Sequence, residues 1–374
     1  MSSVIKSMEK NNRTKPRPPP IGSTGAIGWL RQNLFSNIYN SLLTVICICG
    51  LILIIPAGID WVFLSSQVAG DNRFACQNTG ACWAWIDQRM GQFLFGFYPE
   101  QERWRPMVAF FLLLPALAPW LFERVPAQRY LRIFSIAYPF IATILLVGGF
   151  GLPSVASDKF GGFMLNLIVG LSGIVLSLPV GILLALGRRS KLPLIKWVCI
   201  SFIEIVRGVP LITLLFVSNI LLPIFLPPDA TLDSVIRVII MVTAFASAYM
   251  AEVIRGGLQA IPSGQYEAAK AMGFNYFQSM RLIILPQALR ISIPGIVNTF
   301  IGLFKDTTLV IVIGLFDILG IANAMVANPD WLGLSTETYV FVALFFFIIC
   351  FSMSRYSMWL ERRLGTKGSN GWSS

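Results

Sequence analysis

The sequence of 374 residues contains no histidine, and only 13% of its residues are charged. The lack of histidine excludes a histidine general base, an imidazole metal site and a histidine proton relay. The charged fraction is well below the ~25% that is typical of soluble domains. The pattern G-x-x-x-x-G-K-[ST] is also missing, so this chain does not carry a nucleotide-binding P-loop.

Hydrophobic residues, in contrast, make up 55% of the chain, and they are grouped in long runs. A run of about 18 apolar residues or more is long enough to cross a bilayer as a helix. We therefore predict an all-α polytopic membrane protein with about eight spans, of which the fifth and seventh are long and interrupted by glycine and proline. The predicted spans are residues 38–56, 106–122, 130–150, 161–187, 194–226, 233–255, 291–317 and 338–358.

The positions of lysine and arginine predict how these spans are oriented. If the N-terminus lies in the cytoplasm, 21 of the 29 cationic side chains fall in cytoplasmic loops and tails. The positive-inside rule therefore favours an N-terminus and a C-terminus that are both cytoplasmic. The net charge of +11 does not indicate nucleic-acid binding, because the cations lie in short loops and tails beside the spans.

The spans divide the chain into four parts. Residues 1–37, which are basic, rich in proline and without an evident cleavable signal peptide, are expected to be a disordered cytoplasmic tail. Residues 38–159 are expected to form an N-terminal extension with three spans and a large external loop, 57–105. Residues 160–360 are expected to form a five-span core, and residues 361–374 a second cytoplasmic tail.

The external loop contains the sequence CQNTGAC, in which Cys76 and Cys82 are separated by five residues. In an oxidising compartment the two thiols could form a disulfide that closes a small loop; the alternative is two free thiols near the interface. The other cysteines are spaced through apolar runs and are expected to be packing residues. The sequence WAWI at 83–86 is interpreted as an aromatic anchor at the membrane interface.

The predicted cytoplasmic loop, residues 256–290, is polar and has its own helical pattern. In the sequence SGQYEAAKAMGF, Ser263 is the expected N-cap, the alanines are good helix formers and Gly273 is the expected C-terminal stop. A second short amphipathic segment, YFQSMRLIIL, is expected to end at Pro286. Small residues on the first helix would let another protein approach closely. The loop is therefore interpreted either as a docking element or as an ordinary connection between two spans.

The same loop resembles the EAA signature of bacterial ABC-importer permeases, with every signature position at the family's spacing. The matching positions are Glu267, Ala268, Ala269, Gly273, Leu285 and Pro286. The resemblance implies that the loop is a coupling helix that sits in a cleft of a separate ATPase subunit. It also implies that ATP and magnesium are bound by that partner, which would explain the missing P-loop, and that this chain has no cofactor or metal of its own.

The resemblance covers roughly residues 160–360, in segments such as FIEIVRGVPLITLLF and LFKDTTLV, and it is to permeases for polar amino acids. It implies the type I ABC importer fold, a multi-pass position in a bacterial inner membrane, an ATPase homodimer and an external amino-acid-binding protein. Residues 1–159 depart from the five-span minimum of that branch. They are similar to the longer, M-type subunit of general L-amino acid (Aap-type) importers, which implies a heterodimer with a second permease chain.

Charged residues inside spans are costly and tend to mark function. In the seventh predicted span, Lys305 and Asp306 are followed by Thr307 and Thr308. If the helix starts near Pro294, Lys305 lies roughly 16 Å along it, close to the midplane of a ~30 Å apolar core. An amino acid carries both charge signs, so these residues are candidates for the substrate path. The alternative is a Lys305–Asp306 salt bridge that serves only packing.

Glu204 and Arg207 form a second candidate in the fifth predicted span. They directly precede Gly208-Val209-Pro210, which is expected to break the helix. Broken helices inside the membrane are tolerated where they face protein or a water-filled cavity. The alternative is a Glu204–Arg207 salt bridge on one helix face.

We therefore predict the permease subunit of an ATP-driven importer that carries L-amino acids, polar or broad in range, from the periplasm to the cytoplasm, without covalent chemistry of its own. The alternatives are a stand-alone secondary transporter or channel, a non-transporting assembly or sensory subunit, and the same ABC architecture for an opine or another amino-acid-derived solute. The charges inside the spans would suit a stand-alone transporter as well, but the coupling loop would then have no role.

Overall fold

The computed structural model describes residues 25–70, 76, 79–122, 125–225, 227, 232–329 and 333–369, with side chains up to residue 363. The chain divides into two compact units: residues 1–67 with 76–81, and residues 68–75 with 82–374. Within the described ranges the regular structure is helical, and β-bridges occur only as isolated pairs. The predicted all-α class is therefore confirmed.

The first unit contains one long apolar helix. A short helix, α2 (Gly25–Asn33), precedes α3 (Ile38–Ile59), which continues as a π-helical turn to Leu64. The side chain of Asn37 caps α3 by accepting a hydrogen bond from the backbone N–H of Asn40 at 2.8 Å. No residue of α3 is buried, and its exposed side chains are apolar on every face, which suits a helix surrounded by lipid.

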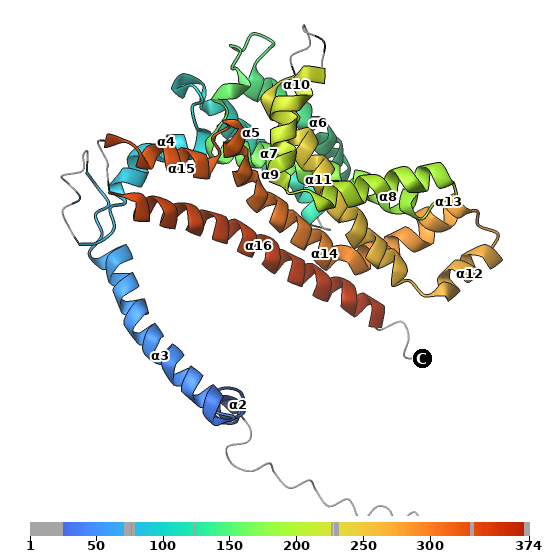
Figure 1. The fold of residues 1–374 in the computed structure, drawn as a ribbon, viewed down its shortest axis with the longest axis horizontal. Coiled ribbons are helices and arrows are strands. Elements are labelled where there is room, and N and C mark those ends of the chain that lie inside the picture. The colour runs from blue at the N-terminus through green and yellow to red at the C-terminus, as the bar shows by residue number, and fades with distance from the viewer. Residues whose placement is uncertain are drawn as a thin grey trace, which may run out of the picture. The chain divides into compact units, whose positions relative to one another are not determined.

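The second unit contains the remaining helices (Figure 1). They are α4 (Ala84–Phe95), α5 (Trp104–Leu121), α6 (Gln128–Val147), α7 (Gly162–Arg188), α8 (Pro193–Gly208), α9 (Leu211–Phe216), α10 (Leu222–Phe225), α11 (Ser234–Gln259), α12 (Ser263–Ala271), α13 (Tyr276–Ser279), α14 (Leu285–Asp306), α15 (Ile318–Val326) and α16 (Ser335–Ser369).

The centre of this unit is the packing of α11 against α7, with α14 on α11 and α16 on α14 (Figure 1). Gly257 shows how closely α11 and α14 approach. A Cβ atom at this position would clash with Ser292 Oγ and with the carbonyl oxygen of Ala288. Glycine is therefore required here by backbone proximity rather than by backbone conformation.

Seven helices in the described part of the chain are long and apolar enough to cross a membrane, and a bent pair of helices supplies an eighth candidate. Each coincides with one of the eight predicted spans. The largest difference is in the seventh, which forms a helical stretch from Tyr276 to Ile313 and so starts well before the predicted residue 291. The N-in, C-in orientation stays a prediction.

The predicted break in the fifth span is present. α8 and α9 are bent by 105° around Val209 and Pro210. Val209 is extended, with φ −113° and ψ 134°, as expected for a residue before proline. Pro210 lacks the N–H that would continue the helix.

The interpretation of WAWI as a membrane-interface anchor is wrong for Trp85. This side chain is only 1% exposed, and its Nε1–H donates a hydrogen bond to Thr338 Oγ1 at 3.0 Å. α4 packs against α7 and α15, so Trp85 belongs to the protein interior, where a buried indole N–H needs a partner.

Cys76 and Cys82 are both disulfide-bonded. Free thiols are found at Cys47, Cys49, Cys199 and Cys350. The bonded state of the first two residues contradicts the alternative of two free thiols. Their pairing with each other, which would close the predicted small disulfide loop, stays a proposal.

Candidate coupling surface and translocation path

The polar loop begins with α12, which has the predicted C-terminal end but not the predicted cap. The N-cap position is Pro262, without a side-chain hydrogen bond, so Ser263 lies inside the helix. Gly273 has φ +78°, and the N–H of Phe274 donates to the carbonyl of Ala269 at 3.1 Å. Together with the bond from Gly273 N–H to the carbonyl of Lys270 at 3.0 Å, this is a Schellman ending, which favours glycine.

The second half of the loop does not end at Pro286 as predicted. Asn275 and Gln278 form a reciprocal capping box at the start of α13. A π-helical turn, Met280–Ile284, then leads directly into α14. Pro286 lies in the first turn of α14, directly after this π-helical turn. The loop is thus continuous with the seventh span.

Two side-chain links hold α12 on the transmembrane helices. Arg189, just after α7, donates to Tyr266 Oη at 3.2 Å and to the carbonyl oxygen of Leu258 at 3.3 Å. Its guanidinium carbon lies 5.8 Å from the Tyr266 ring centroid, a cation–π distance. On the other side, Gln287 of α14 donates to Gln265 Oε1 at 3.1 Å. These contacts connect α12 to the end of α7 and to α14.

The signature residues divide between two faces. Ala269 is 1% exposed and is the buried residue of α12. The small side chain of Ala269 therefore serves packing within this chain. The predicted close approach of another protein then depends on the other alanines of α12, such as Ala268. The exposed members of the signature are Glu267, Ala268, Gly273 and Pro286, with Leu285 half-buried.

Sequence reasoning missed three large apolar side chains beside them. Met272, Tyr276 and Phe277 are 69%, 64% and 67% exposed. The signal that could have found them is the presence of large apolar side chains in an otherwise polar loop. We name the group of Glu267, Ala268, Met272, Tyr276 and Phe277 the coupling surface.

A cluster of charges lies at the ends of α7, α8 and α11. Glu252 Oε1 accepts from Arg188 Nη1 at 2.8 Å, and Oε2 accepts from Arg255 Nη2 at 2.8 Å. Arg207 Nη1 approaches Oε2 to 3.8 Å. Arg188 also pairs with Glu204 at 2.8 Å. We name these five residues the arginine cluster; three cations share two carboxylates.

The cluster changes the interpretation of the fifth span. The alternative Glu204–Arg207 pair is not among the ion pairs of the described residues, because Glu204 reaches α7 and Arg207 reaches α11. Arg207 also lies 5.3 Å from the ring centroid of Tyr249. The two residues therefore join separate helices, and a relative movement of α7, α8 and α11 must break or exchange these contacts.

The four residues at 305–308 differ in their surroundings. α14 ends at Asp306 and a 3₁₀-helix, Thr307–Ile313, follows, so helical geometry changes here. Thr307 is 1% exposed; its Oγ1 accepts from Asn166 Nδ2 at 2.8 Å and donates to the carbonyl of Phe304 at 2.7 Å. Lys305 is exposed, and neither it nor Asp306 is in an ion pair within the described part of the chain.

The depth argument for Lys305 was based on a wrong helix start. α14 begins at Leu285, nine residues before Pro294, which lies inside the helix. Counted from Leu285, Lys305 is about 30 Å along the axis at 1.5 Å per residue. Depth alone therefore does not place Lys305 at the membrane midplane. The hypothesis that Lys305 lines the substrate path depends instead on its exposed charge.

Fold and site together define a polytopic membrane protein with an exposed, partly apolar surface on a polar loop. A family described as "Binding-protein-dependent transport system inner membrane component" matches residues 177–366. The chain is 48% identical over 353 residues to the inner membrane amino-acid ABC transporter permease protein YhdY of Escherichia coli (strain K12), covering 94% of this chain and 96% of that protein. It is 45% identical over 427 residues to the glutamate/glutamine/aspartate/asparagine transport system permease protein BztC of Rhodobacter capsulatus, covering 96% and 98%.

The chain therefore belongs to the family of inner membrane components of binding-protein-dependent transport systems. It is a multi-pass permease subunit of an ABC importer rather than an enzyme, as predicted. A crystal structure of an amino acid ABC transporter with histidines is also similar, at 29% identity and a TM-score of 0.48 over 54% of this chain and 92% of that chain. Membership of the family implies an ATPase and a binding protein as partners.

Proposed function

We propose that this chain is the permease subunit of an importer that carries L-amino acids, polar or broad in range, from the periplasm to the cytoplasm. The observation that carries the proposal is similarity over nearly the whole chain to two permeases named for amino acids. The same architecture serving an opine or another amino-acid-derived solute is the second candidate, since it would need the same fold and the same coupling surface.

The proposed partners follow from the coupling surface. An ATPase homodimer, which binds ATP and magnesium, docks on α12 and α13. A second permease chain completes a heterodimer, and an external binding protein delivers the solute. The exposed apolar side chains of Met272, Tyr276 and Phe277 support docking, because they are the side-chain types that anchor protein interfaces.

The proposed mechanism is alternating access driven through α12. Arg189 links α12 to the end of α7, and its neighbour Arg188 pairs with both Glu204 and Glu252. Movement of α12 by the ATPase thereby reaches the arginine cluster. Exchange of these ion pairs lets α7, α8 and α11 shift relative to one another.

The substrate path is proposed to include Lys305 and Asp306, with Thr308 beside them and Thr307 anchoring the segment to Asn166. Replacing Lys305 with alanine is expected to lower amino-acid uptake by about tenfold, because a charged partner for the substrate carboxylate is lost. Co-purification of the ATPase should be unchanged. Uptake at the wild-type rate in a correctly assembled variant would contradict a role for Lys305 in the path.

The proposed function is tested by purifying the chain from its native membrane in mild detergent and identifying the co-purifying proteins by mass spectrometry. An ATPase and a second, shorter permease are expected. The complex in proteoliposomes, supplied with the binding protein, should then take up a labelled L-amino acid only with ATP. A chain that purifies alone and transports without ATP would instead support a stand-alone secondary transporter or channel.

A further inference from the structure

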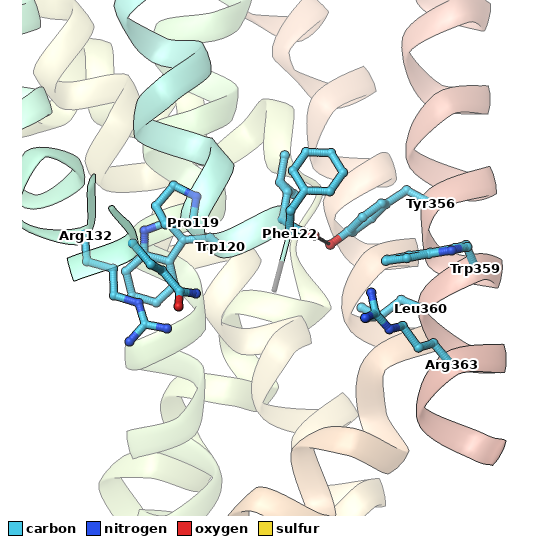
Figure 2. A pocket seen from close by; sticks show the side chains of 10 residues that line it. Pro119, Trp120, Phe122, Arg132, Tyr356, Trp359, Leu360 and Arg363 are labelled. Atoms are coloured by element: carbon cyan, nitrogen blue, oxygen red, sulfur yellow. Dashed lines mark hydrogen bonds between the residues drawn. The ribbon is translucent and has the colours of Figure 1, made fainter. Parts of the chain in front are cut away.

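Asn166, Thr307 and Asp317 form a buried polar network apart from the coupling surface and the arginine cluster. Their exposed fractions are 0%, 1% and 0%. They come from three segments: α7, the 3₁₀-helix after α14, and the residue that precedes α15. We name these three residues the polar node. A hollow of about 320 Å³ between α16 and the neighbouring ends of α5 and α6 (Figure 2) is lined by other residues, so the polar node is a separate feature.

The side chain of Asn166 is the centre of the polar node. Its Oδ1 accepts a hydrogen bond from the backbone N–H of Ile318 at 3.1 Å. Its Nδ2 donates to Thr307 Oγ1 at 2.8 Å and to Asp317 Oδ2 at 3.0 Å. Because a backbone N–H can only donate, the amide oxygen must face Ile318, and this contact fixes which way round the amide lies.

The two acceptors of Asn166 are themselves held in place. The Thr307 hydroxyl donates to the carbonyl oxygen of Phe304 at 2.7 Å, so its oxygen is left to accept from Asn166. Asp317 caps α15, because its Oδ1 accepts from the backbone N–H of Gly320 at 2.8 Å, and its Oδ2 is left for Asn166. An aspartate at position 166 would instead face Asp317 with a second carboxylate, which is unfavourable.

The hydrogen bond to Thr307 fixes the rotation of the end of α14. Thr307 is still right-handed helical, with φ −60° and ψ −20°, and a helix turns by about 100° per residue. Lys305 therefore points about 160° away from Thr307 around the axis, which agrees with an exposed Lys305 and a buried Thr307. Gly170 of α7 shows how close the packing is, since a Cβ there would lie 3.4 Å from Thr307 Cγ2.

We propose that Asn166 and Asp317 are positioning residues of the substrate path. Asn166 holds Thr307 on α7, and Thr307 in turn sets the direction in which Lys305 is presented to the solute. Asp317 holds the Asn166 amide in place and connects this setting to the start of α15. The inference rests on the proposed function, in which Lys305 and Asp306 belong to the path.

The first measurement tests the anchor without the solute. In the purified complex, Asn166→Asp is expected to speed hydrogen exchange at the backbone amides of the Thr307–Ile313 helix by about tenfold or more, because the donor to Thr307 is lost and two carboxylates repel each other. Exchange at the wild-type rate would overturn the proposal.

The matched control for Asn166→Asp is Ser177→Ala. Ser177 is another side chain of α7 with an exposed fraction of 0%. Its hydroxyl donates to the carbonyl oxygen of Ile174 in the same helix at 3.2 Å, so it does not join α7 to α14. This substitution should leave exchange in the 3₁₀-helix unchanged. Equal acceleration by both substitutions would mean that any polar change in α7 loosens this segment, which would overturn the specific role of Asn166.

The second measurement separates positioning from a merely structural role. Uptake and ATP hydrolysis are measured together in proteoliposomes that contain the complex and the binding protein. A complex that is only less stable loses both activities in proportion, whereas a misdirected Lys305 lowers the amount of solute carried per ATP. Asn166→Asp and Lys305→Ala are each expected to lower this ratio by about tenfold, and their combination to lower it by no more than about twofold further, because both act on the same charge. Independent effects would multiply to about 100-fold and would overturn the proposal.

Exchange of the two residues supplies a rescue. In Asn166→Asp with Asp317→Asn, one carboxylate and one amide face each other again, and the Thr307 hydroxyl can turn to donate to the carboxylate. The ratio of solute to ATP should return to within about threefold of the wild-type ratio. A ratio that stays as low as in Asn166→Asp would overturn the proposal.

Two further variants keep the test decisive. If Asn166→Asp fails to assemble, Thr307→Val removes the hydroxyl with little change of shape and carries the same comparison with Lys305→Ala. Wild-type uptake in Lys305→Ala would contradict the substrate path itself and the positioning role with it. Independent effects of Asn166→Asp and Lys305→Ala, in contrast, would contradict only the positioning role.

Discussion

Replacing Glu267 with lysine is expected to abolish ATP-driven uptake and to release the ATPase from the complex. Glu267 is exposed on α12, within the coupling surface, so its side chain is available to a partner. If Glu267 faces a cation of the ATPase, the reversed charge places two like charges together, which costs several kcal/mol and weakens binding by about 100-fold or more. The measurement is the amount of ATPase that co-purifies with the variant, together with ATP-dependent uptake in proteoliposomes.

The matched control for Glu267 is Glu100→Lys. Glu100 has an 83% exposed side chain and forms only a local pair with Arg103 at 3.2 Å, and it lies in the predicted external loop. The same change of charge there is expected to leave ATPase binding intact. Glu267→Gln should give an intermediate loss. If Glu267→Lys retains a normal amount of ATPase, α12 is not the docking element.

The positions of the spans and of the coupling loop could be predicted because they depend on local pattern. Long apolar runs, and Gly273 after a run of alanines, are each visible within one segment. The break before Pro210 was equally predictable, because proline acts on its own helix and on the residue before it.

The contacts between helices could not be predicted, since they depend on which faces meet. Glu204 and Arg207 are spaced for a pair on one helix, yet each finds a partner on another helix. Ala269 reads as part of a docking face, but its position on α12 turns it into the core. Pro286 reads as a helix end, but it follows a π-helical turn and starts α14 instead. The periodicity of a segment predicts that it forms a helix. Which way each side chain of that helix faces depends on the neighbouring helices, which the segment's own sequence does not specify.

The second large effect is expected from Glu252→Gln. The Glu252 side chain is 16% exposed and is the acceptor that Arg188, Arg207 and Arg255 share. Glutamine keeps the shape but removes the charge, so three cations remain around one carboxylate, that of Glu204. Charged hydrogen bonds of this kind contribute about 1.5–3 kcal/mol each, and we expect a loss of about 2–3 kcal/mol in stability because solvent partly screens the site. A fall in the thermal unfolding midpoint of the purified complex measures it.

Glu252→Gln should also stop uptake while ATPase remains bound, because the coupling surface is untouched. Loss of uptake with the ATPase still bound distinguishes Glu252→Gln from Glu267→Lys, which is expected to lose both uptake and ATPase binding. Glu204→Gln is the control: its side chain is 55% exposed, and within the part of the chain that the structure describes its ion pair is with Arg188, so its effect on stability should be below about 1 kcal/mol. The double variant Arg255→Gln with Glu252→Gln should recover part of the stability, because Arg255 loses its paired carboxylate in Glu252→Gln, whereas Arg188 keeps its pair with Glu204. Equal destabilisation by Glu204→Gln and Glu252→Gln would mean that Glu252 is not the centre of the cluster, and the route from α12 through Arg189 and Arg188 would then have to end elsewhere.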